Sequence, residues 1–97
     1  MIDNVDYERY YKLMDKFSNS SHRNQLIQEC AELIHNITKL NQRLLNNEPI
    51  EDEIFNNYPI ELLHVKLIID YFISRDKNLQ YTMMKEFIRL YSRFKNE

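Results

Sequence analysis

The 97-residue chain contains no glycine, and its only prolines are Pro49 and Pro59. Proteins built from β-sheets normally need glycine in the tight turns between strands. The absence of glycine therefore argues against a β-rich fold and favours helices joined by polar loops. A chain of this length fits a single domain, residues 1–97, whose thin stability margin would gain from pairing with other copies.

Cysteine and long apolar runs are also scarce. The single cysteine, Cys30, cannot form an internal disulfide, which suits a reducing compartment. The most apolar stretch, residues 62–73, is interrupted by His64, Lys66 and Asp70, so it cannot supply the roughly 18 apolar residues of a membrane span. The first residues are too polar and acidic for a signal peptide. These features predict a cytoplasmic protein with no membrane partner.

The chain also lacks an excess of one charge. Its formal net charge is −2 with 29% charged residues, so acidic and basic side chains are interspersed. A nucleic-acid-binding domain of this size normally carries a clear basic excess. We therefore expect no nucleic-acid partner.

The apolar residues that are present follow a helical period and predict four helices. The first covers residues 5–17, and Ser20 or Ser21 would cap the second helix, residues 23–45. The second helix is the clearest, because its apolar residues alternate steps of four and three and form a seam for another helix. That seam consists of Leu26, Cys30, Leu33, Ile37, Leu40 and Leu44. The fourth helix is expected over residues 79–95.

The third helix is expected over residues 57–74, with Asn57 as its cap. Pro59 would lie in the first turn, where the missing N–H of proline costs nothing. The helix is apolar on nearly every side, which is typical of a helix at the centre of a bundle or in a subunit interface. The polar segment 46–57 is expected to be a connection that holds one short helical turn. The fold class predicted from these patterns is all-α, a four-helix bundle.

Acidic residues and a histidine recur at one spacing on the second and third helices. Glu29 and Glu32 lie three residues apart, and so do Glu61 and His64, so each pair shares one face of its helix. Glu61 lies among apolar neighbours, where a carboxylate must be paired, metal-bound or protonated. If the two helices pack together, three carboxylates and one imidazole converge, and clusters of that kind hold Mg²⁺ or Mn²⁺.

The same residues carry a resemblance to the MazG-like nucleotide pyrophosphohydrolases. That family is marked by E-x-x-E on one helix and E-x-x-D on the next. Here the first motif is Glu29-Cys30-Ala31-Glu32 within QLIQECAELIHNITKL, and Glu61 and His64 occupy the second motif within NYPIELLHV. The closing KEFIRLYSRF is similar to the end of the short phage and bacterial members, so the similarity covers residues 25–94.

The resemblance implies an activity, a cofactor and an assembly. Members of the family hydrolyse (d)NTPs to the monophosphate and pyrophosphate, using Mg²⁺ held by acidic residues. Carried over by position, Glu29, Glu32 and Glu61 would be the catalytic carboxylates that bind the metal. His64 would take the remaining metal-ligand position, and Lys39 would reach a phosphate. Members of the family assemble from helical bundles, so a homodimer or homotetramer with the MazG fold is expected.

The chain departs from the family pattern at the metal site. His64 stands where the family has aspartate, and Gln28 and Ile60 stand where acids are often found. Imidazole is a poor ligand for Mg²⁺ but is tolerated by Mn²⁺. Activity is therefore expected to be stronger with Mn²⁺ than with Mg²⁺. The alternative to an enzyme is a catalytically inactive helical protein that binds nucleotides or other proteins.

A basic stripe on the fourth helix offers a second phosphate contact. Lys85, Arg89 and Arg93 follow one another at four-residue steps, and Arg89 is the expected phosphate ligand. A solvated helix face is the commoner explanation of such a stripe. Glu61 on the third helix also has a simpler interpretation than a metal ligand. In that interpretation it forms an ion pair with Lys66 or Arg89.

A di-iron bundle is a further alternative. Such bundles use two E-x-x-H pairs, and this chain has Glu32 with His35 and Glu61 with His64. One more carboxylate would be needed from each of the two other helices. Those carboxylates would be Glu8 and Glu86.

Overall fold

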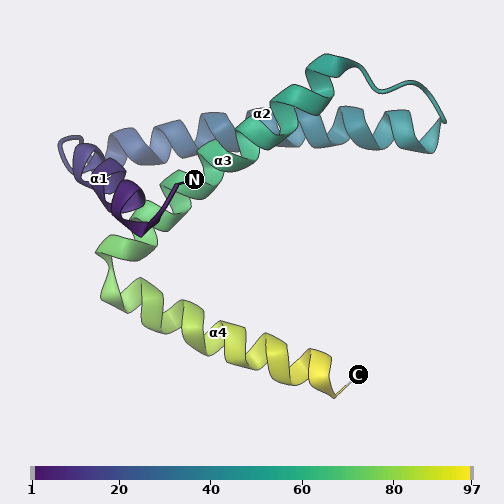
Figure 1. The fold of residues 1–97 in the computed structure, drawn as a ribbon. Coiled ribbons are helices and arrows are strands. Elements are labelled where there is room, and N and C mark those ends of the chain that lie inside the picture. The colour runs from purple at the N-terminus through teal and green to yellow at the C-terminus, as the bar shows by residue number, and fades with distance from the viewer. Residues whose placement is uncertain (1, 97) are drawn as a thin grey trace.

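The structure is a computed structural model that describes residues 2–96, and the regular secondary structure of this part of the chain is entirely helical. The helices are α1 (Asn4–Met14), α2 (Asn19–Leu45), α3 (Asp52–Arg75) and α4 (Lys77–Lys95) (Figure 1). The all-α class and the number of helices predicted from the sequence are therefore confirmed. Within residues 2–96, no helix is both long enough and apolar enough to cross a membrane.

α2 and α3 form a long antiparallel hairpin, which is the central feature of the fold (Figure 1). The seam predicted on α2 is half-buried from Leu26 to Leu40, whereas Leu44 near the end of the helix is exposed. At the connection, Arg43 forms salt bridges with Glu48 and with Glu51, the latter with Nη2 and Oε1 2.9 Å apart. These ion pairs join the end of α2 to the start of α3.

α1 packs against one end of this hairpin and ends at Met14 rather than at Phe17 as predicted. The main buried cluster joins α1 to α3 and consists of Tyr11, Met14, Ile68 and Tyr71. Just after α1, the Asp15 carboxylate accepts hydrogen bonds from Arg75 Nε (3.0 Å) and from the Tyr71 hydroxyl (2.8 Å). The hydrogen bond from Arg75, followed by that from Tyr71, holds the pKa of Asp15 below its usual value. The turn after α1 is thereby fixed to the end of α3.

The start of α3 differs from the prediction. The helix begins at Asp52, so Asn57 is not its cap and Pro59 lies in the helix interior. Proline there cannot donate the helical N–H hydrogen bond. The longer helix is favoured because Ile54 is buried, with 3% of its surface exposed. Asp52 and Glu53 in the first turn also suit the positive end of the helix dipole.

The starts of α2 and α4 also lie earlier than predicted, and side-chain caps explain both. Ser18 caps α2, with its hydroxyl oxygen 3.0 Å from the Ser21 amide nitrogen that donates to it. Asp76 ends α3 and caps α4 through the Leu79 amide, also at 3.0 Å. The connection between α3 and α4 is therefore shorter than the loop expected from the sequence.

α4 leaves the hairpin at Asp76 and runs away from α2 (Figure 1). None of residues 77–95, all of which the structure describes, is buried. The exposed apolar side chains of α4 are Tyr81, Met83, Met84, Phe87, Ile88, Tyr91 and Phe94. A single chain therefore leaves a wide apolar surface uncovered on this helix.

Candidate metal centre

Polar residues follow one face of α2, each directly before a residue of the apolar seam. They are Gln25, Glu29, Glu32, Asn36 and Lys39, separated by steps of four and three residues. This spacing arranges them in a line along the helix. We call this line the polar stripe.

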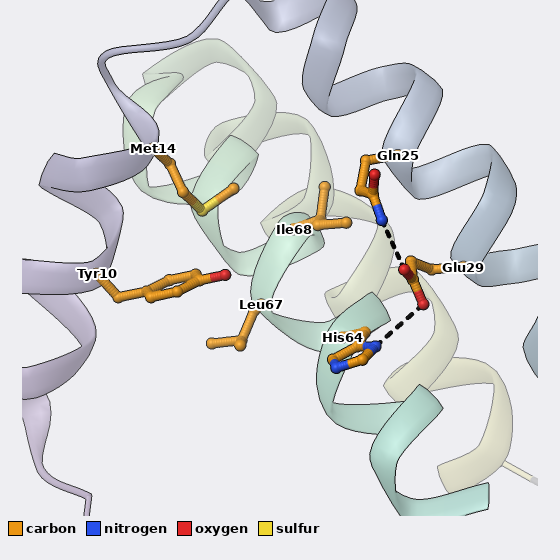
Figure 2. Close-up of a pocket in the computed structure, with 7 residues that line it drawn as sticks. All are labelled: Tyr10, Met14, Gln25, Glu29, His64, Leu67 and Ile68. Carbon is orange, nitrogen blue, oxygen red and sulfur yellow. Dashed lines mark hydrogen bonds and ion pairs between the residues drawn. The ribbon is translucent and has the colours of Figure 1, made fainter. Parts of the chain in front are cut away.

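Glu29 lies within the polar stripe and is buried, with 8% of its surface exposed. Its Oε1 accepts a hydrogen bond from Gln25 Nε2 at 2.6 Å, and its Oε2 lies 3.1 Å from His64 Nδ1 on α3 (Figure 2). Gln25 and Glu29 are four residues apart on α2, so their side chains meet on one helix face. The Glu29 carboxylate is thus held between the two helices.

Glu61 and His64 approach Glu29 from α3. One ligand atom from each of these three residues lies within 4.8 Å of the other two, and His64 Nδ1 is 3.8 Å from Glu61 Oε2. We call these three residues the Glu29–Glu61–His64 cluster. The structure thus brings together Glu29, Glu61 and His64 from the set predicted to bind a metal.

Glu61 contributes a buried oxygen that no hydrogen-bond donor reaches. Among the described residues, Glu61 Oε2 is the one fully buried side-chain oxygen or nitrogen without a partner. The hydrogen bond shared with Glu29 raises the pKa of Glu61 to about 7, and burial and the Glu32 carboxylate act in the same direction. The same hydrogen bond, with smaller help from His64 and Gln25, outweighs burial and lowers the pKa of Glu29. Without a cation and below about pH 7, Glu61 therefore keeps a proton that it can share with Glu29.

A divalent cation fits this set of donors. Two carboxylates and an imidazole nitrogen are common ligands of such ions, and a cation would replace the shared proton and satisfy Glu61 Oε2. The imidazole of His64 favours Mn²⁺ and related transition-metal ions over Mg²⁺. The His64 side chain is 46% exposed, so an ion can reach the cluster from solvent.

In the absence of divalent cations, we expect the free energy of unfolding to fall as the pH rises from 4.5 to about 7. In this window the folded protein keeps the Glu61 proton, whereas the unfolded chain, with its ordinary pKa, has lost it. Urea unfolding at about pH 5 and about pH 8 measures the change. Glu61→Gln cannot ionise and should lose this part of the pH dependence; equal pH dependence in both proteins would contradict the assignment of the proton.

Glu32 and Lys39 lie in a neighbouring cavity of about 410 Å³, which Glu61 also lines. Glu32 is close enough to raise the pKa of Glu61, but it is not among the atoms that meet within 4.8 Å. Glu53, from the first turn of α3, lines the same cavity and was not predicted, because the segment around it was interpreted as a connection. The acidic pair at residues 52 and 53 was the signal that could have revealed it.

Arg89 does not lie at the cluster. It belongs to α4, which runs away from the hairpin, and its Nε donates to Glu86 Oε2 at 2.9 Å (Figure 1). Lys66 is paired with Asp70 on α3. Neither basic residue therefore forms an ion pair with Glu61, so the plain interpretation of Glu61 as half of such a pair is wrong.

The arrangement of a di-iron bundle is not formed in the described chain. Glu8 is bound to Arg75, with Oε1 and Nη2 3.1 Å apart, at the junction of α1 and α3. Glu86 is bound to Arg89 on α4. The two extra carboxylates that such a centre needs are therefore committed to arginines elsewhere.

Comparison with other proteins gives no match: no protein family, no curated protein and no solved structure matches this chain. The family resemblance accordingly depends on the motifs around Glu29 and Glu61. The chemistry of the site depends on the geometry of the Glu29–Glu61–His64 cluster.

Proposed function

We propose that this chain is a metal-dependent (d)NTP pyrophosphohydrolase of the MazG-like type. The observation that carries the proposal is the buried Glu61 oxygen, which faces Glu29 and His64 and has no donor among the described residues. A buried polar atom without a partner lowers the stability of the fold. A cation bound at this site would coordinate the Glu61 oxygen and remove that cost. The E-C-A-E-L-I motif around Glu29 supports the reaction class.

The proposed reaction consumes one water and one nucleoside triphosphate. Water adds to the α-phosphorus, and the bond from that phosphorus to the oxygen bridging to the β-phosphate breaks. The products are the nucleoside monophosphate and pyrophosphate. A bound divalent cation supplies a more acidic water and positive charge against the phosphates. Glu29, Glu61 and His64 would hold this ion, with Glu32 as an additional carboxylate beside Glu61.

Lys39 supplies the positive charge that the acidic residues of the site lack. It follows Glu32 by two helical turns on the polar stripe and lines the cavity next to Glu61. A lysine ammonium is a common ligand of phosphate groups. Lys39 is therefore proposed to bind the outer phosphates of the substrate.

Incubation of the protein with a panel of (d)NTPs and either Mn²⁺ or Mg²⁺ tests the proposal. We expect equal amounts of monophosphate and pyrophosphate, formed faster with Mn²⁺. Release of single phosphate ions would mean that another bond breaks and would overturn the proposed reaction. Metal-dependent nucleotide binding without products would favour the second candidate, a non-catalytic nucleotide-binding or regulatory module, which His64 in the motif position supports.

A homodimer or homotetramer is part of the proposal. On α4, Phe87 and Tyr91 are 67% and 61% exposed, and on α3 Ile60 and Leu63 are 48% and 40% exposed. Burying apolar surface contributes about 25 cal/mol per Å². A second copy of the chain is therefore proposed to cover α4 and the exposed side of α3.

Light scattering on the purified protein is expected to give a mass of at least two 12.0 kDa chains. Phe87→Glu should shift the mass toward one chain, because it places a charge on the apolar face of α4. Ser92→Glu adds the same charge on the same helix at an exposed polar position and should leave the mass unchanged. A wild-type mass of a single chain at high concentration would overturn the proposed assembly.

A further inference from the structure

A second cavity adjoins the Glu29–Glu61–His64 cluster on the side of α1 (Figure 2). Its volume is about 250 Å³, and Glu29 and His64 form part of its wall. Tyr10 and Met14 enter it from α1, one helical turn apart. The cavity is therefore built by three helices and opens directly onto the proposed metal site.

The walls of this cavity are apolar on one side and polar at one end. Met14, Leu67 and Ile68 supply the apolar surface, and the ring of Tyr10 extends into the space beside them (Figure 2). The Tyr10 side chain can contact a ligand, since 45% of the surface of the residue is exposed. A flat ring with apolar faces and polar edges matches such a surface.

Gln25 fixes the hydrogen-bonding character of the polar end. Its Nε2 donates to Glu29 at 2.6 Å, and because a carboxylate only accepts, this contact determines which way the amide points. Within residues 2–96 the Gln25 side chain makes no other hydrogen bond, so its carbonyl oxygen is left as an acceptor and its second amide hydrogen as a donor. The edge of a nucleobase offers the complementary pair.

The order of sites along the polar stripe matches the order of groups in a nucleoside triphosphate. Gln25 precedes Glu29 by about 6 Å along the helix axis, and Lys39 follows Glu29 by about 15 Å. The cavity at Tyr10, the cluster and the cavity at Lys39 therefore follow one another in a line. A substrate laid along this line has its base at Gln25, its α-phosphate near the cluster and its outer phosphates toward Lys39.

We infer that the cavity between Tyr10, Gln25 and Ile68 binds the nucleobase of the substrate, an inference that rests on the proposed function. The cavity is smaller than pockets that enclose drug-sized molecules, so it receives one ring system rather than a whole nucleotide. Tyr10 stacks on the base, and Gln25 binds its edge. The phosphates remain outside this cavity, over the cluster and the Lys39 side.

The test uses NMR to compare two ligands that differ by the nucleoside. One is an α,β-methylene nucleoside triphosphate and the other is inorganic tripolyphosphate. Both are added with diamagnetic Zn²⁺ or Mg²⁺ in place of paramagnetic Mn²⁺. The methionine methyl groups serve as probes, because Met14 lines the cavity whereas Met83 and Met84 lie on α4. We expect the nucleotide analogue, and not tripolyphosphate, to shift the Met14 signal through the ring current of the base. The signals of Met83 and Met84 should respond equally to both ligands.

Affinity measurements complete the test. Tyr10→Ala is expected to weaken binding of the analogue by about tenfold, as is usual for loss of one base-stacking ring. Tripolyphosphate binding should not change, Tyr10→Phe should retain the wild-type affinity, and Tyr81→Ala, which removes an exposed tyrosine from α4, should have no effect.

Two results would overturn the inference, and they have different meanings. If both ligands bind the wild type equally and Met14 does not respond to the base, the cavity does not bind the base, while the proposed function stands. If neither ligand binds the wild type with any divalent cation, the proposed function fails and the inference fails with it.

Discussion

Glu61→Gln is expected to lower pyrophosphate release by more than about a hundredfold, since groups that only support a metal ligand already account for about 10- to 100-fold. The amide keeps the shape of the side chain but carries no charge for a cation. Its N–H group can also donate to Glu29, which occupies the oxygen that a metal ion would need. The variant should therefore lose the metal and the activity together while the helices remain folded.

Thermal melts separate loss of the site from loss of the fold in this variant. A ligand that binds only the folded state at a hundred times its Kd raises the free energy of unfolding by about 2.7 kcal/mol. Mn²⁺ should stabilise the wild type in this way and leave Glu61→Gln unchanged. Glu86→Gln is the matched control, because Glu86 is an exposed carboxylate bonded to Arg89 on α4. A Glu61→Gln protein that retains turnover and Mn²⁺ stabilisation would contradict the assignment.

His64→Asp is expected to change the metal preference of the proposed site. The substitution replaces an imidazole by a carboxylate, which suits Mg²⁺, so Mg²⁺-dependent turnover should rise by about tenfold relative to Mn²⁺-dependent turnover. The His64 side chain is 46% exposed, so the change leaves the packing between α2 and α3 largely intact.

The control for His64→Asp is His64→Asn, which has nearly the same shape and no negative charge. His64→Asn should show no gain with Mg²⁺, because an amide does not restore the missing carboxylate. The ratio of initial rates in the two metals, measured for the wild type and both variants, checks the prediction. An unchanged ratio in His64→Asp would show that this position does not contact the ion.

Helix periodicity predicted the fold class because the apolar residues of α2 follow a regular seam. The sequence was less informative at the ends of helices, where capping residues and prolines can indicate one boundary while tertiary packing favours another. Pro59 suggested a helix start, yet burial of Ile54 in tertiary packing extends α3 back to Asp52. The divergence of α4 from the hairpin could not be predicted either, because its apolar face alone does not show whether this chain or a second copy covers it.

Part of the site could also be predicted from the regular spacing of residues on helices. Glu29, Glu61 and His64 were identified because a fixed spacing on two packed helices brings side chains together. Arg89 was expected to contact a phosphate because of the basic stripe on the fourth helix, and the direction of α4 separates it from the cluster in the folded chain. Tyr10 carried no signal of its own, since a tyrosine on an amphipathic helix is ordinarily a packing residue. Its place beside the cluster depends on how α1 packs on the hairpin.

Electron paramagnetic resonance of free Mn²⁺ tests the central claim most directly, that the Glu29–Glu61–His64 cluster is a divalent-cation site. Adding the wild-type protein to Mn²⁺ should remove the signal of the free ion in proportion to the protein. Glu61→Gln should leave the signal in place, and Glu86→Gln should remove it as the wild type does. An undiminished signal of free Mn²⁺ with the wild-type protein would contradict the claim.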